Sequence, residues 1–206
     1  MIALFDTETT GFPNRGQLSD QPHLVQLAAV LVDDAWAVTS SYQAIIRPDG
    51  WVIPKEVSDI HGVTQERAID EGISEAEALE EWVALVKQAK TLAAHNLAFD
   101  LKIMYAAYRR YSGQGARPFG GVIPKRLWCT MESSTIVCNL PPTEKQPAAG
   151  FTKAKAPKLA EALKILCGEE HESAHTADGD CAALIKVAQE LDKRKLARLA
   201  PSRGWA

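Results

Sequence analysis

The stretch that decides the fold comes at the start of the chain, where residues 2–11 read IALFDTETTG. Four apolar residues followed by acids, threonines and a glycine are typical of a buried strand that runs into a turn. Alternate residues of a strand share a face, so Asp6 and Glu8 present their carboxylates together. Two such charges a few ångströms apart repel by about 4 kcal/mol at an effective dielectric near 20. We therefore expect Mg²⁺ or Mn²⁺ between them, although Asp6 simply ending the strand and Glu8 lying in solvent is the structural alternative.

Further strands and helices are expected to surround this first strand. Residues 24–32 are nearly all apolar, with Gln26 as the interruption, which predicts a strand covered on both faces. The remaining expected strands are 41–47, 91–94 and 127–130. Four helices are expected. The first begins at the Ser74–Glu77 capping box and the second follows His95 and Asn96. The third covers 159–166 and is stopped by Gly168, and the last runs from Ala177 to Leu191. Together they predict an α/β domain over residues 1–195 with a mixed five-stranded sheet flanked by helices, and a C-terminal tail, 196–206, that frays.

The composition is that of an ordinary globular protein of 206 residues, with 46% apolar and 24% charged residues. The 23 basic and 26 acidic side chains leave a net charge of −3, so bulk positive charge does not hold nucleic acid, and any such contact is local. No apolar run approaches the roughly 20 residues of a membrane span. The 4 cysteines show no CxxC spacing, and we expect reduced thiols in a cytoplasmic protein.

Two later motifs combine histidines with acids. Residues 95–100 read HNLAFD, where Asn96 as a helix N-cap and Asp100 as a first-turn acid are both ordinary structural roles. Residues 175–180 read HTADGD just before the last expected helix. There His175 precedes Asp180 by five positions, and an imidazole is well suited to accept a proton near neutral pH.

FDTETTG, HNLAFD and HTADGD, in this order, resemble the motifs of the DnaQ-like 3′–5′ exonucleases, in the DEDDh branch named for four acids and a histidine. The resemblance covers residues 2–191 and implies a ribonuclease H-like fold. It implies that His175 is the general base and that two divalent ions, Mg²⁺ or Mn²⁺, are held by four acids: Asp6, Glu8, Asp100 and Asp180. Asp178 is expected to be only a helix-start acid. Thr176 stands where the sister branch has a tyrosine.

The same resemblance implies the reaction and its substrate contacts. Hydroxide attack on the terminal phosphodiester would release nucleoside 5′-monophosphates from a DNA 3′ end that is single-stranded or frayed. The backbone near Thr9 would meet the 3′-hydroxyl, and Phe12 or Phe99 would stack near the last bases. His61 and Asn96 are further expected substrate contacts, with a surface-loop role as the alternative for His61.

Several alternatives stay open. The chain could trim RNA, act as an inactive nucleic-acid-binding domain, or be another ribonuclease H-like nuclease such as an endonuclease. An active enzyme could serve repair, degradation or proofreading beside a polymerase. Four lysines of the loop before residue 159 could grip a DNA backbone or simply be solvated: Lys145, Lys153, Lys155 and Lys158. Among the other histidines, His95 is expected to be structural, and His23 and His171 to be exposed.

Overall fold

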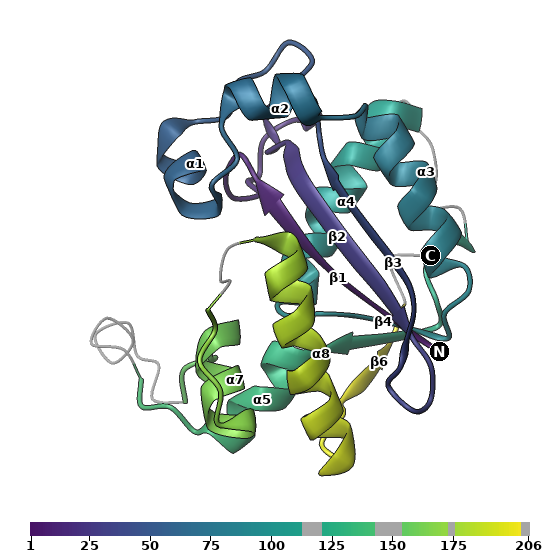
Figure 1. Ribbon diagram of the computed structural model, residues 1–206, viewed down its shortest axis with the longest axis vertical. Helices are drawn as coiled ribbons and strands as arrows, with labels where there is room; N and C mark the ends of the chain where they lie inside the picture. Colours follow the sequence, from purple (N-terminus) through teal and green to yellow (C-terminus); the bar gives the residue numbers. More distant parts are fainter. Residues whose placement is uncertain (113–120, 143–153, 173–175, 203–206) are drawn as a thin grey trace.

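The computed structural model describes residues 1–112, 121–142, 154–172 and 176–202. In these ranges a single sheet of six strands runs in the order β3-β2-β1-β4-β5-β6 (Figure 1). The strands are β1 (Ile2–Thr9), β2 (Leu24–Val32), β3 (Val38–Ile45), β4 (Thr91–Ala94), β5 (Arg126–Cys129) and β6 (Leu199–Pro201). β1 pairs antiparallel with β2 and parallel with β4, so the strand with the two acids lies inside the sheet.

Helices cover both faces of this sheet. They are η1 (Leu18–Asp20), α1 (Lys55–His61), α2 (Gln65–Glu71), α3 (Glu75–Val86), α4 (Leu97–Ser112), α5 (Thr130–Cys138), α7 (Leu159–Cys167) and α8 (Ala177–Lys193). α3 and α4 share one hydrophobic core with the sheet, while α7 and α8 share another on the opposite face. The predicted capping box at Ser74 is confirmed, as is the end of α7 at Gly168, which has a left-handed φ of 74°.

The alternation of β1 determines which way its acids point. Phe5 lies in the core shared with α3 and α4, where its ring meets Trp82 edge to face at 5.4 Å between centroids. Leu4 lies in the other core, among residues of α7 and α8. Burying side chains of this size contributes roughly 1.5–3 kcal/mol each, so a slip of one residue would be costly. Asp6 therefore shares a strand face with Leu4, on the side of α8.

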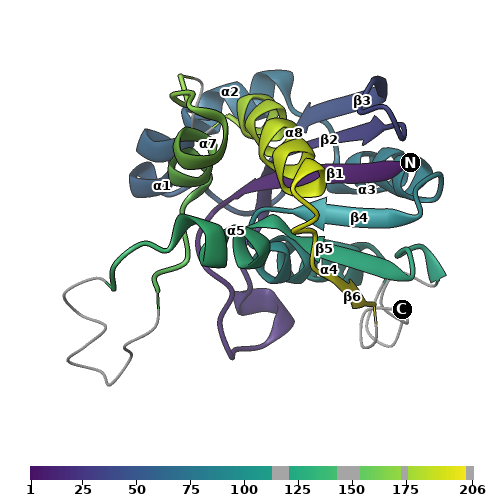
Figure 2. The ribbon, with the colours of Figure 1, turned by 90° about the horizontal axis from the view of Figure 1, so that it is seen from below.

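The sheet has one strand more than expected. β6 lies in the tail predicted to fray and pairs antiparallel with β5 at the sheet edge (Figure 2). Its three residues are exposed and too few to show the alternation that marks a strand. β3 starts at Val38 instead of Ser41, because it too is a largely exposed strand. The division of the chain at residue 195 stays a prediction.

Four short helical segments were not expected from the sequence: η1, α1, α2 and α5. α1 and α2 flank a small separate core that includes Val25, Ile53 and Val63. η1, α1 and α2 have seven residues or fewer, too few turns for an apolar stripe to stand out, whereas the buried residues of α5 are polar: Thr130, Ser133 and Ser134. Within the described ranges, every helix falls short of the length and apolar character that crossing a bilayer would require.

Candidate active site

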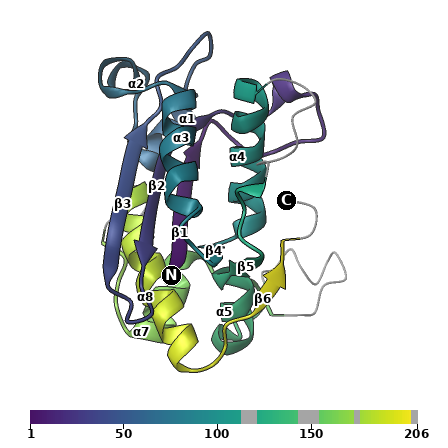
Figure 3. The same ribbon diagram turned by 90° about the vertical axis from the view of Figure 1, so that its right-hand side faces the viewer.

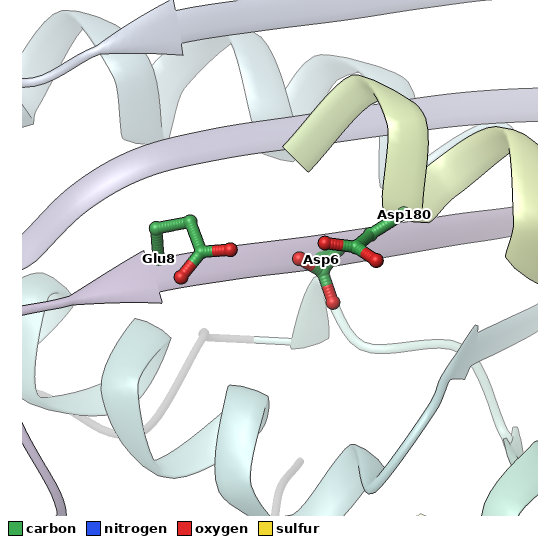
Figure 4. Close-up of side chains that lie close together, drawn as sticks. All are labelled: Asp6, Glu8 and Asp180. Carbon is green, nitrogen blue, oxygen red and sulfur yellow. The ribbon is translucent and has the colours of Figure 1, made fainter. Parts of the chain in front are cut away.

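Three carboxylates meet where β1 passes the first turn of α8. Asp6 and Glu8 extend from β1 and Asp180 from α8, and one oxygen of each lies within 4.8 Å of the others (Figure 4). Glu8 is half-buried, so the alternative that it lies in solvent is wrong. At this separation each pair of charges repels by about 3 to 4 kcal/mol at an effective dielectric near 20. The group therefore needs protons or cations to offset its charge.

The raised pKa values of the group also indicate that its carboxylates need protons or cations. Burial raises the pKa of Asp6 well above its ordinary value, and the charges of Asp100 and Asp180 raise it further. Burial and the charge of Asp180 raise the pKa of Glu8 to about 7. The donors are all carboxylate oxygens, a set that fits hard divalent cations such as Mg²⁺ or Mn²⁺. The residues present therefore fit the metal that the sequence predicted.

Asp100 stands beside this group but outside it. It lies in the first turn of α4, is only 2% exposed, and accepts a hydrogen bond of 2.8 Å from the Thr7 hydroxyl. Burial raises the pKa of Asp100 to about 8, although the Thr7 hydrogen bond works in the opposite direction. Sequence reasoning missed Thr7. The sequence pattern that could have identified it is the alternation of β1, which turns Thr7 away from Asp6 and Glu8 toward the face that α4 covers.

Gln26, the polar interruption of β2, holds the start of α8 against the sheet. Its buried side chain accepts a hydrogen bond of 3.4 Å from the Ala177 backbone N–H, and its backbone pairs with Glu8. Small side chains let the helix come close, since Ala28, Ala177 and Cys181 form a buried cluster there. This packing brings Asp180 over β1. Gln26 is a second positioning residue that sequence reasoning did not identify.

His171 is the histidine that the structure brings to the group. Its Nε2 lies 2.6 Å from Asp180 Oδ1, and its side chain is 5% exposed, so the expectation of an exposed His171 is wrong. The only sequence signal is its place nine residues before Asp180. His175, the expected general base, lies outside the described residues, and its role stays a prediction. Asp178 is exposed and accepts a hydrogen bond from Gln43, as expected of an acid that only begins the helix.

The expected substrate contacts differ in their surroundings. Phe12 is 85% exposed, and its ring meets that of Phe99 edge to face at 6.0 Å. Thr9 is buried, and its hydroxyl donates to the Gly11 carbonyl at 2.7 Å, which shapes the turn after β1. Asn96 is exposed just before α4 and has a left-handed φ of 71°. Phe12 and Asn96 are thus accessible for the contacts predicted for them, whereas Phe99 is partly buried against the core.

His61 is the exception among the expected contacts. It ends α1, is 4% exposed, and accepts a hydrogen bond of 3.1 Å from the Val63 N–H at Nδ1. Its Nε2 is buried and has no partner among the described residues. The surface-loop alternative is therefore wrong, and the burial of the ring also counts against the predicted substrate contact.

The structure also places His95, His23 and one of the lysines in the loop before α7. His95 is structural as expected, since its ring nitrogens lie 3.0 Å from Thr130 Oγ1 and 3.0 Å from the Pro157 carbonyl. His23 is not exposed but half-buried, because it stacks on Trp51 with ring centroids 4.6 Å apart. Lys155 forms an ion pair with Glu161 at 2.5 Å, a structural role. Lys145 and Lys153 lie outside the described residues.

The chain is similar in sequence to epsilon subunits of DNA polymerase III. The DNA polymerase III epsilon subunit of Escherichia coli is 30% identical over 101 residues, which are 49% of this chain and 40% of that protein. The epsilon subunit of Salmonella typhimurium is 28% identical over 101 residues. The chain therefore spans well under half the length of these curated relatives.

Solved structures confirm the fold. E. coli Exonuclease I in complex with a dT13 oligonucleotide matches with a TM-score of 0.70 and 20% identity, over 94% of this chain and 41% of that one. Exonuclease I from Methylocaldum szegediense matches with a TM-score of 0.68 and 19% identity, over 94% of this chain and 40% of that one. The ribonuclease H-like α/β fold expected from the motifs is confirmed.

The family model for exonucleases called RNase T matches residues 3–188, which include every described carboxylate of the site. This match and the epsilon relatives confirm the DnaQ-like resemblance drawn from the three motifs. The chain belongs to the RNase T family of exonucleases.

Proposed function

We propose that this chain is a divalent-metal-dependent 3′–5′ exonuclease that removes nucleoside 5′-monophosphates from single-stranded or frayed DNA ends. The observation that carries the proposal is the convergence of Asp6, Glu8 and Asp180 within 4.8 Å, with buried Asp100 beside them. Membership of an exonuclease family and a fold like that of an Exonuclease I bound to dT13 support DNA as the substrate.

Burial and neighbouring charges raise the pKa values of Asp6, Glu8 and Asp100, so this group of acids is suited to a reaction that needs bound cations. Asp6, Glu8 and Asp180 would supply oxygens to one ion, and Asp100 would serve a second. Two divalent cations, when bound, neutralise such a group and lower the pKa of an attacking water. The Thr7 hydroxyl would keep the Asp100 carboxylate turned toward the site, and Gln26 would keep Asp180 over β1.

The proton of the attacking water needs an acceptor. We assign this role to His175, whose five-residue interval to Asp180 matches the family motif. The water oxygen would form a bond to the terminal phosphorus while the bond to the 3′ oxygen of the preceding nucleotide breaks. Phe12 and Phe99 would stack on the last bases without reading their sequence, because every base offers an aromatic face.

The test uses 5′-end-labelled single-stranded DNA, frayed duplex DNA and RNA, each with Mg²⁺, with Mn²⁺ or with chelator. We expect a ladder that shortens from the 3′ end of DNA, with nucleoside 5′-monophosphates as the released product. Asp6→Asn should abolish the release, whereas Asp178→Asn, the same chemical change at a position in the helical turn of Asp180 but outside the carboxylate group, should keep it. Internal cleavage, or hydrolysis that chelator leaves intact, would contradict the proposal. Faster trimming of RNA than of DNA would reassign the substrate.

A further inference from the structure

A basic groove of about 560 Å³ lies between α4 and the loop that follows β1. The turn of this loop that carries η1 runs beside α4 (Figure 3). Arg15 and Leu18 line the groove from the loop, and Lys102, Tyr105 and Arg109 line it from the helix. Three lining residues are cationic and none is acidic, although the chain as a whole has a net charge of −3. The groove is therefore a local positive surface on an acidic protein.

The helix side of the groove leads away from the candidate active site. Phe99, Lys102 and Arg109 fall on one face of α4, because residues three to four apart share a helix face. Phe99 is the neighbour of Asp100 and meets the exposed ring of Phe12. At a rise of 1.5 Å per residue, the path from Phe99 to Arg109 covers about 15 Å. The cations therefore continue in a line from the aromatic pair.

Within the described ranges, the three cations have no acidic partners of their own. Arg110, the neighbour of Arg109, forms an ion pair with Glu75 at 3.0 Å, whereas Arg15, Lys102 and Arg109 form no ion pair with any residue that the structure describes. Charges on a protein surface are commonly balanced, so an unbalanced set in a groove favours an external anion.

Arg109 is also held in place before any ligand arrives. Its Nη1 donates to Tyr105 Oη at 3.0 Å, and its guanidinium carbon lies 5.6 Å from the centroid of the Tyr105 ring. Its Nε is buried and lacks a hydrogen-bond acceptor among the described residues. A guanidinium fixed in this way loses little side-chain entropy on binding and presents its free donors to a phosphate.

We infer that this groove binds the phosphodiester backbone of the single DNA strand upstream of the 3′ end, an inference that rests on the proposed function. At 3.4 Å per stacked nucleotide, about 15 Å accommodates roughly four nucleotides. Contacts to phosphates position a strand without reading its bases, as an enzyme that shortens any sequence requires. The aromatic pair would receive the terminal bases and the groove the strand that follows them.

The test compares a long and a short substrate in two charge-matched variants. Arg15→Gln, Lys102→Gln and Arg109→Gln are combined in one protein. Lys87→Gln, Lys90→Gln and Lys125→Gln are combined in the control, since these three lysines are exposed and lie outside the groove. For each protein, kcat/KM is measured on a 12-nucleotide single strand and on a dinucleotide, from 50 to 200 mM salt, in Mg²⁺.

The groove variant should lose much of the preference for the long substrate. Each lost phosphate contact lowers the slope of log kcat/KM against log salt by about 0.7, so three contacts lower it by about 2. Over a fourfold rise in salt, the wild-type protein should therefore lose about 20-fold more activity on the 12-mer than the groove variant does. The control variant should keep the wild-type ratio and slope.

The outcomes separate this inference from the proposed function. A groove variant that hydrolyses both substrates with the wild-type length ratio and salt slope would overturn the groove and leave the exonuclease standing. A wild-type protein that hydrolyses neither substrate would overturn both. Lys102→Gln alone, a change at an exposed position, covers the case in which the triple variant does not fold, and should lower the slope by about 0.7.

Discussion

Replacing Glu8 by glutamine should make the metal-free protein more stable while it removes activity. The substitution keeps the shape of the side chain and deletes its charge. In the folded protein, burial and the charge of Asp180 raise the pKa of Glu8 from 4.5 to about 7. The folded state therefore holds this proton more tightly than the unfolded state does. The contribution of Glu8 to metal-free stability should therefore fall as the pH rises from about 4.5 to about 7 and stay level above that range.

The size of the effect follows from the two pKa values. At 1.36 kcal/mol per pH unit, ionising Glu8 in the folded protein costs up to about 3 kcal/mol above pH 7. Glu8 is only half-buried, so solvent screening reduces this to about 2 kcal/mol. For a domain of this size, each kcal/mol shifts the melting temperature by roughly 2–4 °C. The neutral variant should thus melt about 4–8 °C above the wild type at pH 8.

Thermal unfolding of both proteins at pH 5 and pH 8, with chelator and then with Mg²⁺, is the assay. The gain should be full at pH 8, clearly smaller at pH 5, where the folded protein still holds the Glu8 proton, and reduced by Mg²⁺, which stabilises only the charged group. Glu81→Gln, at an exposed position of α3, is the control and should show no such dependence on pH. A gain of equal size at both pH values, or a loss of stability at pH 8 in chelator, would refute the reasoning that Glu8 belongs to a repelling group.

Three further changes test other parts of the structure. His175→Ala should lower kcat by about 10²–10⁴-fold with little change in DNA binding, and a wild-type rate would reassign the general base. Thr7→Val deletes the hydrogen bond to Asp100 and should raise the Mg²⁺ concentration needed for half-maximal rate by about 10–100-fold; an unchanged metal titration would show that Thr7 does not position the acid. Trp82→Ala removes the fully buried ring that packs on Phe5 and should lower the free energy of unfolding by about 3–5 kcal/mol, measured with denaturant, and a loss below 1 kcal/mol would contradict its place in the core.

Several strands and helix starts could be predicted from local patterns in the sequence. The first strand, the second strand at Leu24–Val32 and the short strand at Thr91–Ala94 were predicted with the boundaries that the structure has or close to them, because buried strands carry continuous apolar runs. The start of α3 was readable from a Ser and a Glu that cap each other. β6 was not, because its exposed residues carry no periodic signal and its pairing with β5 joins segments more than 70 positions apart in the chain.

The sequence by itself determined the chemistry: two acids on one strand face, two more at helix starts, and a family likeness that named all four. Tertiary structure decided how these acids are arranged, with Asp6, Glu8 and Asp180 in one group and Asp100 beside it on Thr7. It also decided that His171 reaches Asp180, that His61 is buried and that Arg15 of the loop after β1 lines a groove with Lys102 and Arg109 of α4. The physical reason is that composition and spacing depend on neighbours in the chain, whereas pKa values, hydrogen bonds and grooves depend on segments that meet only when the sheet and its helices pack.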